Sequence, residues 1–301
     1  MAKKTLIVIV GPTAIGKTNL AIGLAQYFNT EIVSADSRQF FKEMNIGTAK
    51  PTITEQNAAK HHFIDSHSIH QFFSTGDFEI ESLKVLEAIF SKNDIAIAVG
   101  GSGLYVNALC EGLDELPETD LKIREQLNQQ LAEEGIESIR LQLQKVDPKY
   151  FDSVDQNNPQ RMIRGLEMFL STGIQLSSLL THQKKERNFN IIKIGLNMER
   201  SELYNRINLR VDEMVKQGLL EEVKSLLPYK HLNGLKTVGY TELFDFLDHK
   251  ISFDEAIAKI KQNTRRFAKR QLTWFNRDPQ ITWFNPNQFN EIKEFLDQKI
   301  K

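Results

Sequence analysis

Residues 11–18 combine the residue types and the spacing that a phosphate-binding site requires. The stretch Gly-Pro-Thr-Ala-Ile-Gly-Lys-Thr fits the pattern G-x-x-x-x-G-K-[ST] without a mismatch. Backbone N–H groups of such a loop surround a phosphate, its lysine reaches the outer phosphate oxygens, and its last hydroxyl can bind Mg²⁺. We therefore predict that a phosphorylated ligand binds here. The loop residues are Gly11, Pro12, Thr13, Ala14, Ile15, Gly16, Lys17 and Thr18.

Asp36 and Ser102 are polar residues that follow two apolar runs, residues 31–35 and 95–99. Such runs predict strands that are buried in a parallel sheet. Ligands of open α/β sheets bind at the carboxyl ends of the strands, so we expect both side chains to lie beside the phosphate loop. Alternatively, Asp36 caps a helix or forms a turn, and the glycines around Ser102 form a plain tight turn.

The strand predicted over residues 95–99 ends in Gly100-Gly-Ser-Gly103 and not in an acidic residue. Many P-loop nucleotidases have an aspartate at that position, which holds Mg²⁺. Glycines instead allow another stretch of backbone, or a ligand, to approach closely. This strand end argues against a kinase, although the loop alone does not identify the phosphorylated ligand.

Two groups of basic residues could bind a polyanion. Arg161 and Arg164 are three residues apart on a helix predicted over 159–172, where Glu167 could pair with them instead. Residues 259–277 contain seven basic residues and no acidic one, in a chain whose formal net charge is −1. This unbalanced run predicts a track for nucleic-acid phosphates rather than a solvated face. We assign the aromatic residues within it, Phe267, Trp274 and Phe275, to the core.

The histidines and the single cysteine carry less information. His61, His62, His67 and His70 lie within ten residues, but no cysteine accompanies them and their spacing matches no standard zinc site. We expect a polar loop there. Cys110 excludes an internal disulfide and is predicted to be a small buried residue, which suits a reducing cytoplasm. No apolar run approaches the length of a membrane span, so we expect no membrane partner.

The periodicity predicts an α/β fold, with a P-loop-type parallel sheet flanked by helices and an all-helical insertion domain. Buried strands are expected at residues 6–10, 31–35, 95–99 and 191–196. Amphipathic helices are expected at 19–28, 76–91, 104–109, 121–132, 137–146 and 159–172, and helices from 197 to about 275. We assign residues 1–111 and 187–301 to a catalytic core with basic C-terminal helices, and 112–186 to the insertion.

Six sequence blocks, in this order along the chain, closely resemble those of the bacterial tRNA dimethylallyltransferase (tRNA isopentenyltransferase) family. The resemblance runs from residue 6 to about residue 275, nearly the whole chain. The blocks are Gly11-Pro-Thr-Ala-x-Gly-Lys-Thr18, Ser34-Ala-Asp-Ser-Arg-Gln39, Ile46-Gly-Thr-Ala-Lys-Pro51, Gly100-Gly-Ser-Gly-Leu-Tyr105, Asn158-Pro-Gln-Arg-x-x-Arg164 and Thr264-Arg-Arg-x-Ala-Lys-Arg-Gln271.

The resemblance implies transfer of a dimethylallyl group from its diphosphate to N6 of the adenosine just 3′ of the tRNA anticodon. The loop at 11–18 would then hold the prenyl diphosphate, with Mg²⁺ bound at Thr18. Asp36 would bind the adenine N6 and act as general base. Ser102 stands where the family usually has threonine and keeps the hydroxyl. The implied partners are the anticodon stem-loop of tRNA and dimethylallyl diphosphate, and we expect a monomer.

The resemblance also implies a set of tRNA-binding residues, drawn from the core, the insertion and the basic segment. A block around Arg161 and Arg164 would contact either tRNA or diphosphate. Ile15 replaces a common serine and Phe41 a common tyrosine, so a hydrogen bond at position 41 is lost. The tRNA-binding set is Asp36, Ser37, Arg38, Gln39, Ser102, Arg124, Gln160, Arg161, Arg164, Arg265, Arg266, Lys269 and Arg270.

Three other functions remain open from the sequence. A P-loop kinase of a small metabolite or nucleotide would turn over ATP. A nucleotide-gated RNA-binding regulator would account for residues 259–277 but leaves Asp36 and Ser102 without a task. An adenylate prenyltransferase would need no long basic helix, so residues 259–277 favour tRNA as the acceptor.

Overall fold

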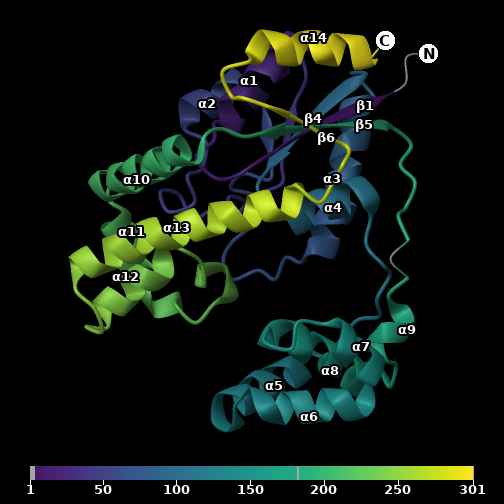
Figure 1. Cartoon of the computed structure of the whole chain (residues 1–301), viewed down its shortest axis with the longest axis vertical. Coiled ribbons are helices and arrows are strands. Elements are labelled where there is room, and N and C mark those ends of the chain that lie inside the picture. The colour runs from purple at the N-terminus through teal and green to yellow at the C-terminus, as the bar shows by residue number, and fades with distance from the viewer. Residues whose placement is uncertain (1–3, 182, 301) are drawn as a thin grey trace. The chain divides into compact units, whose positions relative to one another are not determined.

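A parallel six-stranded sheet forms the centre of the larger part of the chain (Figure 1). The computed structural model describes residues 4–181 and 183–300. The strands lie in the order β3-β2-β4-β1-β5-β6, and every described pair is parallel. Their bounds are β1 Thr5–Val10, β2 Ile32–Ser34, β3 His61–His62, β4 Ile95–Gly100, β5 Asn190–Leu196 and β6 Ile281–Phe284.

The central strand β1 explains why the apolar run is continuous. Leu6 pairs with Ala96 of β4 on one side and with Ile191 of β5 on the other. Alternate side chains of β1 enter two different apolar clusters, one on each face of the sheet. Both faces of the strand are therefore buried, and all six of its residues are inaccessible to solvent.

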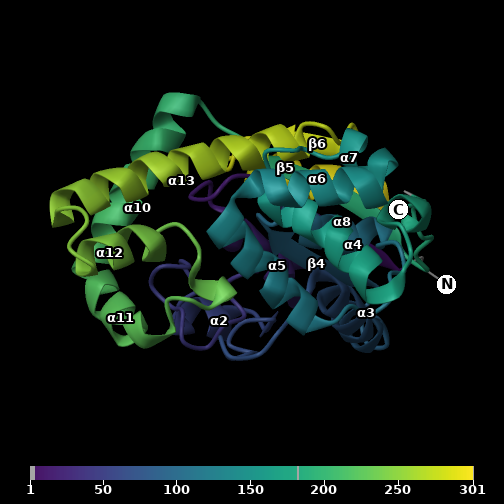
Figure 2. The ribbon, with the colours of Figure 1, turned by 90° about the horizontal axis from the view of Figure 1, so that it is seen from below.

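Helices cover both faces of this sheet (Figures 1 and 2). Helix α13 is the longest of them and packs against α10 and α12, and its C-terminal part reaches α4. Two short 3₁₀ turns at Leu227–Tyr229 and Asn233–Leu235 precede α12. The helices are α1 Lys17–Tyr27, α2 Ile53–Ala58, α3 Thr75–Phe90, α4 Gly103–Glu111, α10 Arg200–Lys216, α11 Leu219–Ser225, α12 Tyr240–Leu247, α13 Phe253–Phe275 and α14 Phe289–Ile300.

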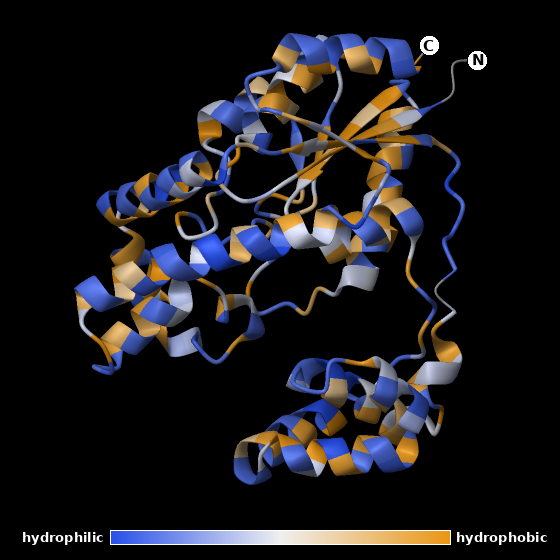
Figure 3. Cartoon of the chain, viewed as in Figure 1, coloured by the Kyte–Doolittle hydropathy of each residue, from blue (hydrophilic) through white to orange (hydrophobic). Residues whose placement is uncertain are grey.

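Residues 112–185 form a second compact unit, which is all helical and has its own apolar core. Its sequence marks the helix starts: Asn158 accepts a hydrogen bond from the N–H of Arg161, and Pro159 occupies the first turn. Hydrophobic and hydrophilic residues alternate along its helices (Figure 3), and apolar residues such as Ile139, Leu143 and Met162 form its buried core. The helices are α5 Leu121–Glu134, α6 Ile136–Val146, α7 Pro148–Ser153, α8 Pro159–Thr172 and α9 Leu176–Leu179.

Arg187 fixes the point at which the chain returns from the helical unit to the sheet. Its guanidinium donates hydrogen bonds to the last turn of α4, at the carbonyls of Ala108 (2.6 Å) and Leu109 (3.0 Å). It also pairs with Glu79 of α3 at 2.9 Å, and both side chains of this pair are buried. A cation at the C-terminus of a helix satisfies carbonyls that have no partner within the helix.

The predicted α/β fold with its parallel sheet is confirmed, as are the four predicted strands and the predicted helices. Two edge strands, β3 and β6, the short helices α2, α7 and α9, and the C-terminal helix α14 were not predicted. The expectation of a polar loop at the histidines was wrong for His61 and His62, because their backbone forms β3 beside β2. In the described parts of the chain, no helix is both long enough and apolar enough to cross a lipid bilayer.

Candidate active site

The phosphate loop joins β1 to α1, as predicted. Gly11, Ala14 and Gly16 have positive φ angles of 145°, 65° and 102°, which turn the backbone sharply between strand and helix. A Cβ atom on Gly11 would lie 2.7 Å from the carbonyl oxygen of Leu196 in β5, so glycine is required there. Because α1 begins at Lys17, the free N–H groups of its first turn face the loop and favour an anion.

Lys17 folds back onto its own loop. Its Nζ donates hydrogen bonds to the carbonyls of Gly11 at 3.0 Å and Pro12 at 2.7 Å. Burial lowers the pKa of Lys17 to about 7, the charge of Arg210 on α10 acts in the same direction, and the Asp36 carboxylate opposes them. The ammonium is therefore poorly compensated without a ligand, and an anion in the loop would restore its charge.

Asp36 and Ser102 lie next to each other at the carboxyl ends of β2 and β4, as the topology predicted. The Oδ1 atom of Asp36 accepts hydrogen bonds from the N–H groups of Arg38 at 2.9 Å and Gln39 at 3.3 Å. Ser102 Oγ accepts from the N–H of Ser37 at 3.0 Å and donates to its Oγ at 3.2 Å. Asp36 is therefore also a turn former, and both bonds use the same carboxylate oxygen.

The glycines after β4 allow the two strand ends to meet. A Cβ atom on Gly100 would lie 2.1 Å from the carbonyl oxygen of Ala35, far inside van der Waals contact. The N–H of Ala35 donates to Val99, and the N–H of Ser102 lies 3.4 Å from the same Ala35 oxygen. The interpretation that glycine permits close approach is confirmed, and the approaching group is the backbone that leads into Asp36.

Arg38 and Gln39 continue the Asp36 turn and are tied to the surrounding protein. Arg38 Nη1 donates to the carbonyl of Ser37 at 2.8 Å, while its Nε is buried without a hydrogen-bond partner among the described residues. Gln39 Nε2 donates to two carbonyls of the loop 46–51, both at 3.1 Å. The third sequence block is thereby held close to Asp36.

Helix α13 contacts both glycine-rich turns, which the sequence did not reveal. Gln271 accepts a hydrogen bond from the N–H of Thr13 at 2.8 Å and donates one to the carbonyl of Gly101 at 2.9 Å. A Cβ atom on Gly103 would lie 2.3 Å from Nε1 of Trp274. In the sequence analysis, Gln271 was the last residue of the sixth block, and no physical role was assigned to it. Arg210 was also missed, because a single arginine on a mixed-charge helix gives no signal.

The charge of the basic segment 259–277 is partly balanced in three dimensions. Lys259 pairs with Glu255, Lys261 with Asp212, and Arg265 donates to the side chain of Asn208. The two carboxylates, Glu255 and Asp212, lie outside the segment, so the inference of an unbalanced run was wrong for Lys259 and Lys261. Arg265 keeps its charge unbalanced, because Asn208 is neutral. The exposed members of the predicted tRNA-binding set on α13 are Arg266, Lys269 and Arg270.

The assignment of aromatic residues in this segment to the core holds for Phe275, which is buried, and Trp274, which packs against the core cluster. It was wrong for Phe267. That ring is 39% exposed, and the Arg270 guanidinium lies 5.7 Å from its centre.

In the helical unit, the alternative pairing with Glu167 is found for Arg164 at 3.1 Å. Arg124 of α5, which was not part of that alternative, also lies 3.5 Å from Glu167. The Glu167 side chain is almost completely buried, so it is neutralised by these two cations. Gln160 and Arg161 are exposed at the start of α8. Of the predicted tRNA-binding residues in the block 158–164, only Gln160 and Arg161 are therefore fully exposed to solvent.

The four histidines do not form a common site. His62 contacts Glu31 at 2.6 Å and His67 contacts Ser66 at 2.8 Å. Across residues 4–181 and 183–300, no three His, Cys, Asp or Glu side chains are grouped as metal ligands. Cys110 is buried as predicted, and burial raises the pKa of its thiol to about 12.

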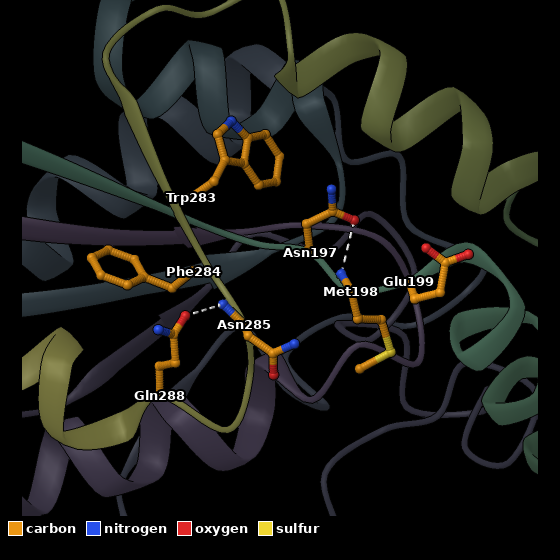
Figure 4. Close-up of a pocket in the computed structure, with 7 residues that line it drawn as sticks. All are labelled: Asn197, Met198, Glu199, Trp283, Phe284, Asn285 and Gln288. Atoms are coloured by element: carbon orange, nitrogen blue, oxygen red, sulfur yellow. Dashed lines mark hydrogen bonds between the residues drawn. The ribbon is translucent and has the colours of Figure 1, made fainter.

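A shallow cavity of about 290 Å³ opens at the carboxyl ends of β5 and β6 (Figure 4). It lies at the same edge of the sheet as the phosphate loop but does not include Asp36 or Ser102. Local hydrogen bonds, such as the one from the N–H of Asn285 to Gln288, shape its wall. The lining residues are Asn197, Met198, Glu199, Trp283, Phe284, Asn285 and Gln288.

The parallel sheet and the phosphate loop at the end of its central strand define a P-loop α/β protein, in which Asp36 follows β2 and Ser102, instead of an acidic residue, follows β4. Residues 39–278 match the model of the IPP transferase family. The chain belongs to this family.

Individual relatives cover the whole chain. It is 52% identical to a tRNA dimethylallyltransferase of Christiangramia forsetii, over 98% of both chains. It is similar to the solved tRNA isopentenylpyrophosphate transferase of Bacillus halodurans, with a TM-score of 0.73 and 37% identity over 99% of this chain and 97% of that one. A eukaryotic dimethylallyltransferase, solved in snapshots of its action on tRNA, gives a TM-score of 0.77 and 27% identity over 98% of this chain and 77% of that one.

Proposed function

We propose that this protein transfers a dimethylallyl group from dimethylallyl diphosphate to N6 of the adenosine 3′-adjacent to the anticodon in tRNA, and releases diphosphate. The observation that carries this proposal is the placement of Asp36 and Ser102 at neighbouring strand ends beside the phosphate loop, where Ser102 bonds to Ser37 of the Asp36 turn and β4 ends without an acidic residue. A kinase would need a metal-binding acid there. The relatives named above support the same reaction.

The diphosphate leaves with its negative charge, and the site is built to hold it. Lys17 and the free N–H groups at the start of α1 would hold an anion in the loop, and the positive charge of Arg210 acts on Lys17. Thr18 supplies a hydroxyl in that first turn, an oxygen donor of the kind that Mg²⁺ accepts beside substrate phosphates. When bound, Mg²⁺ would neutralise part of the charge that develops on the leaving group.

The exocyclic amine of adenine is a weak nucleophile because its lone pair is delocalised into the ring. Asp36 can accept the N6 proton as N6 bonds to the allylic carbon, while the carbon–oxygen bond breaks and its electrons leave with the diphosphate. The other role of Asp36, holding the turn, keeps the carboxylate in place during this step. Ser102 supports the same turn through its hydrogen bonds with Ser37.

The nucleotide must leave its stack for N6 to reach Asp36. We propose that Arg266, Lys269 and Arg270 on the exposed side of α13 hold the phosphates of the anticodon stem-loop. In the helical unit, Gln160 and Arg161 are accessible for a second contact. A monomer acting in the reducing cytoplasm, where its single cysteine stays reduced, completes the proposal.

The direct test offers the protein labelled dimethylallyl diphosphate with Mg²⁺ and one of three acceptors. We expect label in unmodified tRNA, none in AMP, and none in the same tRNA with the adenosine 3′ of the anticodon replaced by guanosine. Label in AMP would identify an adenylate prenyltransferase. Consumption of ATP without transfer of label to either acceptor would identify a kinase and contradict the proposal.

Diphosphate binding is expected to weaken as the pH rises through about 7. Free Lys17 has a pKa of about 7, and a bound anion keeps it protonated, so binding above this pH takes up a proton. The affinity for inorganic diphosphate should fall about fivefold between pH 7 and pH 8. Calorimetry measures this affinity at each pH. The variant Lys17→Met has no titratable group at this position, so its pH profile gives the contribution of the ionisation of diphosphate itself. The same pH profile in both proteins would contradict the lowered pKa.

A further inference from the structure

One buried side chain connects α13 to both glycine-rich turns of the site. The amide of Gln271 lies between the phosphate loop and the turn after β4, with its oxygen on the N–H of Thr13 and its nitrogen on the carbonyl of Gly101. Only 6% of Gln271 is exposed. Both bonds therefore form away from water, where an unsatisfied partner is costly.

The geometry accepts few other side chains. The amide supplies one acceptor and one donor, and each meets a backbone group of the opposite kind. The fit is close, because a Cβ atom on Gly101 would lie 2.2 Å from Nε2 of Gln271. The same turn then continues to Ser102, which holds the Asp36 turn through Ser37.

The other side of the same helical turn is exposed. Lys269 and Arg270 immediately precede Gln271, and both are open to solvent together with Arg266. A helix transmits a displacement along its length as a rigid body. A movement of α13 by about 1 Å would lengthen at least one of the two hydrogen bonds of the Gln271 side chain beyond the usual range for N–H···O contacts.

We propose that Gln271 is a positioning residue that couples the exposed basic face of α13 to the phosphate loop, so that bound tRNA raises the affinity for diphosphate. This inference rests on the proposed function, since it takes tRNA as the occupant of that face. Both hydrogen bonds of Gln271 go to backbone groups of the two turns. It acts by setting where Thr13 and Gly101 stand when tRNA fixes α13. Such a coupling is reciprocal, so diphosphate must raise the affinity for tRNA by the same factor.

The experiment measures the dissociation constant of inorganic diphosphate by calorimetry, with and without a saturating unmodified anticodon stem-loop. In the wild-type protein we expect tRNA to tighten diphosphate binding about fivefold or more. In Gln271→Met, which keeps the length of the side chain and removes both hydrogen bonds, the ratio should fall to about one. The affinity for the stem-loop alone should change less than about twofold.

Gln262→Met is the matched control, because Gln262 is an exposed glutamine on the same helix. It should keep the wild-type ratio. Gln271→Glu is a second variant, in which the same ratio can be measured if the methionine variant fails to fold. Its carboxylate can accept from Thr13 but cannot donate to Gly101, so it should also lose the coupling. In steady state, both variants should raise the KM for prenyl diphosphate at saturating tRNA and, by reciprocity, the KM for tRNA at saturating prenyl diphosphate.

A wild-type ratio of one, or an unchanged ratio in the folded Gln271 variants, would overturn the inference. Failure of the proposed function would give a different result, namely that the wild-type protein transfers no label to tRNA. The two outcomes are separable, because the binding ratio needs no chemical step.

Discussion

Asp36→Asn is expected to lower the rate of prenyl transfer to tRNA about a thousandfold, within the usual range for loss of a general base. The substitution separates the two roles of this side chain. An asparagine oxygen can still accept from the N–H groups of Arg38 and Gln39, so the turn is kept. It cannot take the N6 proton, because an amide is far less basic than a carboxylate. Single-turnover assays with saturating tRNA measure the chemical step directly.

Asp36→Ala provides the comparison, since it loses the turn as well as the base. We expect similar loss of transfer in both variants, with the alanine protein less stable by about 1 kcal/mol, as for loss of a capping side chain. The affinity for tRNA should stay near the wild-type value in Asp36→Asn. Transfer at a near-normal rate in the folded asparagine variant would remove Asp36 from the role of base and leave it a turn residue.

Gly100→Ala is expected to lower the free energy of unfolding of the sheet-containing unit by about 3 kcal/mol or more, at the upper end for overpacking. The added methyl would lie 2.1 Å from the carbonyl oxygen of Ala35 and 2.5 Å from its carbonyl carbon. This neighbour is backbone and is itself held by the bond from Ala35 to Val99, so it cannot move away without breaking the contact between β2 and β4.

Urea unfolding followed by tryptophan fluorescence measures this change, because both tryptophans of the chain, Trp274 and Trp283, belong to the unit that contains Gly100. Gly76→Ala is the control. A methyl at Gly76 meets only Ser74 Oγ at 3.6 Å, an ordinary contact, and lies in the first turn of α3. It should stabilise by up to about 1 kcal/mol. Equal stability of the two variants would show that the β2–β4 contact is far more yielding than its geometry indicates.

The parts that could be predicted from the sequence depend on local patterns. A central parallel strand must be apolar at every position, and a phosphate loop needs glycine where φ is positive, so residues 6–18 were recognised correctly. The position of Asp36 and Ser102 at one sheet edge followed from topology alone. These features need no knowledge of which distant residues meet.

The parts that could not be predicted depend on neighbours that are distant in the sequence. The two-residue strand β3 is too short to show alternation, and β6 is an edge strand whose run of four residues resembles any loop with aromatics. Lys261 looked unpaired because Asp212 is 49 positions away. Gln271 meets Thr13 across 258 positions, and no periodicity in a single sequence links two such residues.

The hydrogen bonds between Arg187 and the end of α4 have a consequence for which parts of the chain can be exchanged during evolution. The polypeptide leaves the sheet after α4 and returns at Arg187, so the point of departure and the point of return are bonded to each other. The helical unit is thus an exchangeable module: it can be lengthened, replaced or grafted elsewhere through one chain entry and one chain exit, without redesign of the phosphate loop.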